Sequence, residues 1–544
     1  MKSPYFNQDH EIFRQTVRQY IETEVRPQAA KWEADERIPK EVWKRMGDLG
    51  FLGINHDEAY GGTNQDFFYS VIYLEEIARA GMGGYAAAIG VHQYMSTAHL
   101  MKVGSEELKQ RILPGAIDGT KWGALGITEP FAGSDVANIR TTAVREGDHY
   151  IINGSKTFIT NGVFCDFITV ACKTDTSAGA GGISLIVVEV GTPGFTSSQL
   201  KKIGWHSSDT GEIAFDNVKV PVSNLVGEEN MGFYYIMDSF QLERLVTGIT
   251  ATEGAQYALD AAMKYMTERE AFGRKLSKFQ VLRHRLAELA SEIEAVRQLS
   301  HHTSWLYSQG EFAVKECSML KLLSTELGKK AADVCLQCFG GYGFMEEYEI
   351  ARMYRDARVG TIVGGTSEIM LEIIAKIMFD QVQYDSAYKN PPAPKAKVEA
   401  APAPAPQPVA QANGALNESS NNTNLNTSTT NTLTMSTLPT AAEIIRSLPE
   451  RLKAGAGVGV DILYHFELEG PHGGHFTVRV HDGACTVQDG LHGEPKCVVK
   501  TTDQTYVDTE LGRTNAQMAV MMGKIKVSNI GSMMKFVEMF NKIS

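Results

Sequence analysis

The N-terminal part of the chain repeats apolar residues at helical spacing. Phe13, Val17 and Ile21 recur every fourth position, and Val71 and Leu74 continue the pattern further along. Apolar positions three or four residues apart fall on one face of an α-helix. The pattern therefore predicts a helical domain over residues 1–121.

From Trp122 onwards the apolar runs become short and are separated by Gly, Asp and Asn turns, which is typical of strands. The runs are Tyr150 to Ile152, Phe167 to Ala171, Ile183 to Val190 and Glu212 to Val220. They predict a compact β-domain over residues 122–226.

Long helical spacing returns after Gly232 and predicts a third, helical domain over residues 227–383. It is sustained through Ala255 to Met266, Phe279 to Leu306 and Met319 to Cys335.

Residues 384–440 form a segment of low complexity. Asp385 to Thr440 contains eight of the 18 prolines and a tract of Asn, Ser and Thr. Such a composition does not bury a core, so we expect a disordered tether. After it, a helical stretch from Ala441 to Leu452 and alternating runs such as Cys497 to Thr502 predict a small α+β domain over residues 441–544.

The composition disfavours several kinds of binding partner. With 64 acidic against 52 basic residues the formal net charge is −12, which disfavours nucleic acid. The seven scattered cysteines fit free thiols in a reducing compartment, and Cys335 with Cys338 lacks the further ligands of a zinc site, so no metal is expected. We find no leader-like or membrane-spanning apolar run and expect a cytoplasmic protein.

Two segments concentrate small and hydroxylated residues. They are Gly126 to Asp135 and Asn153 to Gly162. Glycine, Ser and Thr in tight loops let backbone amides and hydroxyls approach a planar or anionic ligand closely. The same residues are typical of ordinary turns, so these segments by themselves leave both readings open.

Together with further blocks in the same order, these segments resemble the acyl-CoA dehydrogenase family. The further blocks are Gly227 to Phe233, Arg269 to Gly273, Gln337 to Phe344 and Arg355 to Arg358. The resemblance covers residues 1 to about 383. It implies a multidomain fold with an all-α N-terminal domain, a β-barrel-like middle domain and a four-helix-bundle C-terminal domain. It also implies FAD in the crevice between the last two domains.

The resemblance implies two sets of residues that bind FAD. The set around the isoalloxazine ring is Ile127, Thr128, Ser134, Phe158 and Thr160. The set that reaches the FAD of a neighbouring subunit is Arg269, Phe272, Gln280, Gln337 and Gly341. Thr366 and Glu368, at the start of the last helix, are assigned to the cofactor as well. A homodimer or homotetramer follows from the second set.

This sequence departs from the family's pattern beside the flavin. Phe131 stands where Gly is usual, Asn138 where a small residue is usual, and Phe158 where many members have Trp. We expect the loop beside the flavin to differ in shape, although a smaller aromatic side chain still covers the ring.

The position of the catalytic base distinguishes branches of this family. Many members of the family carry a catalytic Glu at the position of Gly364, which cannot abstract a proton. The long-chain and isovaleryl branches carry it in an earlier helix, in a segment that matches Gln241 to Leu245 here. The resemblance therefore assigns proton abstraction to Glu243, and substrate binding to Gly364, Arg244 and Ser134.

The helix period supports Glu243 independently. It follows Phe240 by three residues and Ile236 by seven, so a carboxylate lies on the apolar face of its helix. Burial there is expected to raise its pKa, while Arg244 opposes the shift. The alternative is a structural ion pair of Glu243 with Arg244 or Arg269.

The C-terminal domain resembles the sterol carrier protein family. The segments that carry the resemblance are Ser447 to Leu452 and Gly523 to Ser528. Six methionines follow in the last stretch: Met518, Met521, Met522, Met533, Met534 and Met539. Flexible thioethers suit a pocket for variable acyl chains, but they also fill ordinary cores.

Taken together, these features predict an FAD-dependent dehydrogenase that converts an acyl-CoA thioester, of medium or long or branched chain, into a trans-2-enoyl thioester. We expect electrons to pass to an electron-transferring flavoprotein, and the tethered domain to bind acyl chains. One alternative is an acyl-CoA oxidase, whose flavin is reoxidised by oxygen. The other is a lipid-binding or transfer protein with a vestigial dehydrogenase module.

Overall fold

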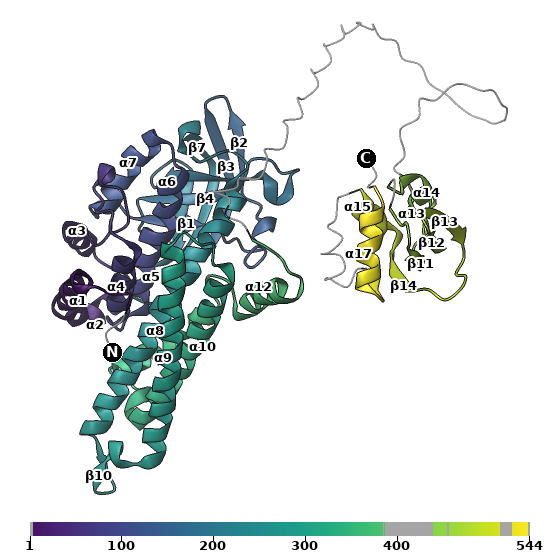
Figure 1. Ribbon diagram of the computed structural model, residues 1–544. Helices are drawn as coiled ribbons and strands as arrows, with labels where there is room; N and C mark the ends of the chain where they lie inside the picture. The colour runs from purple at the N-terminus through teal and green to yellow at the C-terminus, as the bar shows by residue number, and fades with distance from the viewer. Residues whose placement is uncertain (1–3, 385, 387–438, 454–455, 512–524, 542–544) are drawn as a thin grey trace, which may run out of the picture. The chain divides into compact units, whose positions relative to one another are not determined.

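The computed structural model describes residues 4–384, 386, 439–453, 456–511 and 525–541 (Figure 1). The chain forms two compact units, Met1–Ala401 and Pro402–Ser544. Among the helices of these described residues, none combines the length and the apolar character that crossing a bilayer requires. The predicted limits of the individual domains stay predictions, and most of the predicted tether lies outside the described residues.

The first unit begins with a layer of helices, as the apolar spacing predicts. They are α1 (Gln8–Tyr20), α2 (Ala29–Asp35), α3 (Lys40–Asp48), α4 (Phe67–Ala78), α5 (Gly83–Val91), α6 (Thr97–Val103) and α7 (Glu106–Ile117). A capping box between Asn7 and His10 starts α1. Buried Glu75 and Glu76 of α4 accept hydrogen bonds from Arg14, and Glu76 also from Arg18, which fixes α1 across α4.

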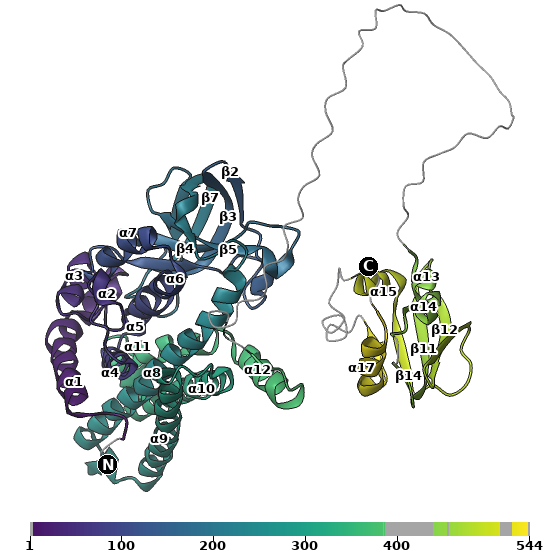
Figure 2. The same ribbon diagram turned by 45° about the horizontal axis from the view of Figure 1, so that its top comes forward.

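The middle of this unit is one eight-stranded sheet, seen edge-on near the top of Figure 2. Its strands are β1 (Gly123–Gly126), β2 (Thr142–Glu146), β3 (His149–Thr160), β4 (Phe167–Lys173), β5 (Ile183–Glu189), β6 (Phe195–Gln199), β7 (Thr210–Pro221) and β8 (Leu225–Val226). The order is β6-β7-β3-β2-β4-β5-β8, with β1 paired in parallel to β4. Each predicted apolar run falls on one of these strands, and only Val190 lies beyond the end of its strand, β5.

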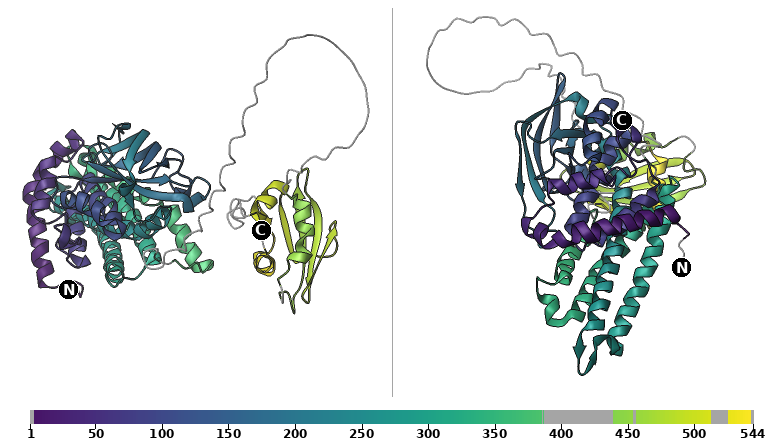
Figure 3. Two further views of the ribbon diagram at one scale, coloured as in Figure 1. Left: turned by 90° about the horizontal axis from the view of Figure 1, so that it is seen from above. Right: turned by 90° about the vertical axis from the view of Figure 1, so that its left-hand side faces the viewer.

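Three long helices follow: α8 (Gly232–Glu268), α9 (Gln280–Ser308) and α10 (Val314–Phe339). They run side by side away from the sheet, as Figures 1 and 3 show. The shorter α11 (Glu349–Ala357) and α12 (Ser367–Phe379) pack on α10 in place of a fourth long helix. The short strands β9 (Glu270–Ala271) and β10 (Arg274–Lys275) form a hairpin between α8 and α9.

One buried carboxylate joins the three parts of this unit. Asp356 of α11 accepts hydrogen bonds from the backbone N–H of Gly83, at the start of α5, and of Trp205, in the loop before β7. The distances are 2.8 and 2.6 Å. Burial, together with nearby Glu33, raises the pKa of Asp356 to about 6. The helix α11, the start of α5 and the loop before β7 are therefore held together by main-chain hydrogen bonds to one side chain.

The second unit is a five-stranded sheet with helices, as predicted. Its strands follow the order β13-β12-β11-β14-β15. Its elements are α13 (Ala441–Arg446), α14 (Leu448–Arg451), β11 (Asp461–Glu469), β12 (Gly474–His481), β13 (Ala484–Asp489), β14 (Cys497–Thr502), α15 (Asp503–Glu510), β15 (Lys526–Val527) and α17 (Ile530–Met539). The expected single helix at Ala441 to Leu452 is split, because Pro449 fits only the first turn of a new helix. Of the six methionines, Met539 is buried, while Met518, Met521 and Met522 lie outside the described residues.

Candidate active site

The structure brings the two small-residue loops together. The backbone N–H of Thr157 on β3 donates to the carbonyl of Thr128 at 2.9 Å. Beside it, the ammonium of Lys156 donates to the carbonyl of Ile127 at 3.0 Å and pairs with Glu129 at 2.7 Å. Lys156 is fully buried and Glu129 nearly so. The two segments therefore form one cradle, held by a buried ion pair.

Phe158 leaves this cradle through a distortion of the strand. The register between β3 and β7 shifts between Lys156 and Ile159, and Phe158 has φ +60° with 70% of its surface exposed. A bulge re-aims a side chain, and left-handed backbone at a non-glycine residue is uncommon outside functional sites. The ring therefore projects from the cradle, as expected of a side chain that covers a flavin. Thr128 and Thr160 are half-buried on the same cradle, and Ser134 is exposed.

Glu243 lies on α8 beside this cradle. Ile236 of α8 and Ile127 of the cradle belong to one apolar cluster, on which Phe240 packs. One turn further along α8, Glu243 is only 6% exposed, and its Oε1 is buried without a hydrogen-bond partner among the described residues. Burial raises its pKa to about 7, and Arg244 opposes the shift. The predicted direction of the shift is confirmed.

The ion-pair alternative for Glu243 fails. No ion pair of Glu243 occurs in the described part of the chain, and Arg244 instead donates from Nη1 to Gln241 at 3.3 Å. The Arg244 guanidinium lies over the ring of Phe240, and its Nε is buried without a partner there. Arg269 follows Glu243 by 26 residues, about 39 Å along α8 at 1.5 Å per residue, and is out of reach. A buried carboxylate and a buried guanidinium thus both keep unused hydrogen-bonding capacity.

The turn before α12 faces the same part of α8. Gly364 has φ +63°, and a Cβ atom there would lie 3.9 Å from Oγ1 of Thr247. Thr247 in turn donates to the carbonyl of Glu243 at 2.8 Å. The N–H of Gly364 donates to no group among the described residues. Gly364 therefore lies beside Thr247, which is one helical turn after Glu243 on α8.

Thr366 and Glu368 have helix-terminal roles. The Thr366 side chain caps α12 by accepting from the backbone N–H of Ile369. Glu368 lies in the first turn of α12, where hydrogen bonds from its own backbone N–H and from Thr366 lower its pKa. Their assignment to the cofactor stays a prediction.

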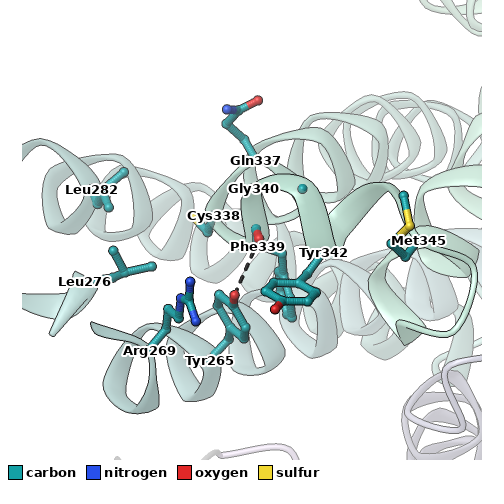
Figure 4. A pocket seen from close by; sticks show the side chains of 11 residues that line it. Tyr265, Arg269, Leu276, Leu282, Gln337, Cys338, Phe339, Gly340, Tyr342 and Met345 are labelled. Carbon is teal, nitrogen blue, oxygen red and sulfur yellow. Dashed lines mark hydrogen bonds between the residues drawn. The ribbon is translucent and has the colours of Figure 1, made fainter. Parts of the chain in front are cut away.

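Three of the five residues of the second predicted set line a separate cavity at the far end of α8 (Figure 4). This cavity of about 600 Å³ is lined by Arg269, Gln337 and Gly341 together with apolar and aromatic side chains. Phe272 occupies the turn of the β9–β10 hairpin with φ +53° and is 94% exposed, and Gln280 is exposed at the first residue of α9. Arg269 and the Gln337 side-chain amide can donate hydrogen bonds here, the Gly341 backbone permits close approach, and aromatic rings can stack. Such a combination fits an adenine dinucleotide.

Arg269 follows Glu243 by about 39 Å of helix, so this cavity lies far along α8 from the predicted base. The assignment of the second set to the FAD of a neighbouring subunit stays a prediction.

Three buried charges were not assigned a role from the sequence: Lys156, Glu129 and Lys321. The burial of Lys156 could have been predicted from the sequence. It is an even number of residues from Tyr150 and Ile152 along β3, so its side chain faces the same, buried side of the sheet. The burial of Lys321 could not, since its partner is a main-chain carbonyl far away in the sequence.

Comparison with known families agrees with this geometry. The models of the acyl-CoA dehydrogenase N-terminal, middle and C-terminal domains match residues 7–120, 124–218 and 230–379. The model of the SCP-2 sterol transfer family matches residues 444–541.

Individual relatives agree as well. The long-chain specific, mitochondrial acyl-CoA dehydrogenase of Sus scrofa is 39% identical over 68% of this chain and 86% of its own length. The crystal structure of acyl-CoA dehydrogenase from Geobacillus kaustophilus is 46% identical, with a TM-score of 0.67 over 69% of this chain and 99% of that one. The chain belongs to the acyl-CoA dehydrogenase family, and it carries an SCP-2 domain after the dehydrogenase domains.

This family uses FAD, and one similar structure is a glutaryl-CoA dehydrogenase from Mycobacterium smegmatis in complex with FADH2. That structure is 29% identical, with a TM-score of 0.66 over 70% of this chain and 97% of that one. The exposed Phe158, the cradle fixed by Lys156 and the cavity beside Arg269 fit such a cofactor.

Proposed function

We propose that this protein removes hydrogen from the α and β carbons of a medium-chain, long-chain or branched acyl-CoA, with Glu243 as the catalytic base. The observation that carries the proposal is the buried carboxylate of Glu243, which has no ion-pair partner within the described residues. Thr247, one helical turn further along α8, lies beside Gly364, whose N–H has no acceptor there. FAD, when bound, supplies the acceptor for the hydride that leaves the β carbon. The product is a trans-2-enoyl thioester.

Residues of the chain itself would carry out the proton transfer, stabilise the developing charge and bind the substrate. Glu243 takes the α-proton, and its raised pKa makes it a stronger base than an exposed carboxylate. The Gly364 amide donates to the thioester oxygen, where negative charge develops as the proton leaves. Arg244 and Ser134 contact the thioester and its carrier. Phe240 and Ile236 keep water away from Glu243 and so maintain the basicity.

The rate should depend on pH through Glu243. The base must be ionised to act, and its folded-state pKa is about 7. We therefore expect kcat/KM to fall about tenfold per pH unit below pH 7 and to rise no further above it. Steady-state assays between pH 5.5 and 8 with one acyl-CoA measure this limb. A profile that stays flat down to pH 5.5 would rule out a buried base with this pKa.

We propose that the functional unit is a homodimer or homotetramer in which Arg269, Phe272, Gln280, Gln337 and Gly341 contact the FAD of a neighbouring subunit. The 39 Å separation along α8 supports this assignment, and a molecular mass of two or four chains in solution is the corresponding observation. We further propose an electron-transferring flavoprotein as acceptor. Stoichiometric peroxide during turnover would indicate an oxidase instead. A cytoplasmic location stays a prediction.

We propose that the SCP-2 domain binds acyl chains and supplies them to the dehydrogenase. A covalent tether raises the effective concentration of one module near the other to about the millimolar range. Deleting residues 387–544 should therefore raise the apparent KM for long-chain substrates severalfold and leave the kcat and the KM for short chains unchanged. The comparison needs the truncated and the full chain with short and long acyl-CoAs. Equal KM values at every chain length would remove the support for delivery.

A further inference from the structure

The turn before α12 is built from two consecutive left-handed glycines. Gly364 has φ +63° and Gly365 has φ +93°, and a Cβ atom on Gly365 would lie 2.6 Å from the terminal methyl of Met370. Glycine adopts such a backbone readily but also leaves it readily, because no side chain restricts it. Whatever holds this turn therefore decides where the amide of Gly364 points.

Lys321 of α10 holds it. Its ammonium donates to the carbonyl of Gly365 at 2.5 Å, and the side chain is fully buried. Lys321 makes no ion pair with any described residue. The nearest acidic group on its own helix, Glu326, is engaged by Lys329 and by Ser367.

Burying an ammonium group costs free energy, because the charge loses its hydration. Burial lowers the pKa of Lys321 to about 8, and the charge of Arg244 from α8 lowers it further, against Glu326 of α10 and Glu368 of α12. A Met side chain would occupy the same volume without this desolvation cost. The contact with the turn is what the lysine adds.

We propose that Lys321 is a positioning residue for thioester activation: its bond to Gly365 fixes the glycine turn so that the Gly364 amide donates to the thioester oxygen. The inference rests on the proposed dehydrogenation and adds to it a side chain that does not touch the substrate.

The test compares Lys321→Met with Lys321→Arg in the full-length, FAD-loaded protein. Lys330→Met is the matched control, because Lys330 lies on the same helix but forms an exposed ion pair with Glu292. We expect Lys321→Met to lower kcat by about 10- to 100-fold with KM changed less than about threefold, since a small misplacement of an activating group costs rate more than binding. Lys321→Arg should recover most of the rate, and Lys330→Met should behave as wild type.

A second readout separates positioning from stability. A 3-thia-acyl-CoA loses its α-proton but is not oxidised, because sulfur occupies the β position, and the bound anion gives a long-wavelength absorbance beside oxidised flavin. Its pKa on the enzyme should be at least one unit higher in Lys321→Met than in wild type. The alkaline decline of kcat near pH 8, where Lys321 loses its proton, should be absent in Lys321→Arg.

The outcomes are distinct. A folded Lys321→Met variant with wild-type kcat and an unchanged pKa of the bound 3-thia-acyl-CoA overturns the proposal. If Lys321→Met does not fold, an alkaline decline that is identical in Lys321→Arg and wild type overturns it. If wild type itself neither oxidises an acyl-CoA nor deprotonates the 3-thia analogue, the proposed dehydrogenation has failed, which differs from a failure confined to Lys321 variants.

Discussion

Replacing Glu243 by Gln is expected to lower kcat by about four orders of magnitude while FAD stays bound. A positioned general base contributes up to about 10⁴-fold to a proton transfer, and the amide has the size of the carboxylate but cannot accept the α-proton. Because Glu243 forms no ion pair within the described structure, its neutralisation leaves no opposite charge newly unpaired. The measurement is kcat with a saturating acyl-CoA, together with the flavin content of the purified variant.

The same substitution should stabilise the fold, with a sign that depends on pH. Burial raises the folded pKa of Glu243 from 4.5 to about 7, so keeping it ionised costs about 3 kcal/mol above pH 7. This cost is absent below pH 4.5, where the carboxyl group is protonated in both states. Urea unfolding should therefore show Glu243→Gln more stable than wild type at pH 8 and equal to it at pH 4.

Glu253→Gln is the matched control for this prediction. Glu253 is a second carboxylate of α8 with a pKa raised by burial, but its oxygens pair with Arg79 and Arg297. We expect Glu253→Gln to retain kcat within a few-fold. If both variants lost activity equally, the loss would reflect damage to α8 and the role of Glu243 as base would have no support.

Replacing Lys156 by Met should lower the free energy of unfolding by about 3–5 kcal/mol and release FAD. The pair of Lys156 with Glu129 is almost entirely buried, so removing the cation leaves a carboxylate charge inside the cradle without compensation. The hydrogen bond from Lys156 to the carbonyl of Ile127 is lost as well. Chemical unfolding of the apoprotein and the ratio of flavin to protein measure the two effects.

The double variant Lys156→Met, Glu129→Gln tests the stated cause. The backbone N–H groups of Arg140 and Thr141 donate to different oxygens of Glu129, so the single Gln amide oxygen can still accept from one of them. The double variant should therefore recover part of the lost stability. A double variant that is no more stable than Lys156→Met would show that the unpaired charge is not what destabilises the cradle.

Much of the fold and the burial of Glu243 were predictable, for local reasons. The spacing of Phe240 and Ile236 placed Glu243 on the apolar face of its helix, and the structure confirms its burial and the direction of its pKa shift. Apolar runs of strand length marked the middle domain, because alternation and length are properties of a few neighbouring residues.

The remaining features depend on contacts between distant segments. The hydrogen bonds from the backbone of Gly83 and Trp205 to Asp356 join three parts of the chain, and no local sequence pattern predicts them. Likewise, sequence periodicity does not reveal that Phe158 and Phe272 adopt left-handed backbone, because aromatic residues rarely do so. Both are exposed by that conformation, which is the property a flavin contact requires.

The central claim is that Glu243 removes the α-proton of a thioester. The most direct measurement is the flavin absorbance after anaerobic mixing of FAD-loaded wild-type protein and the Glu243→Gln variant with short, branched and long acyl-CoAs. The account predicts that at least one acyl-CoA bleaches the wild-type flavin and that the variant binds the same compound without bleaching. Bleaching of the variant at a rate close to that of wild type would contradict it.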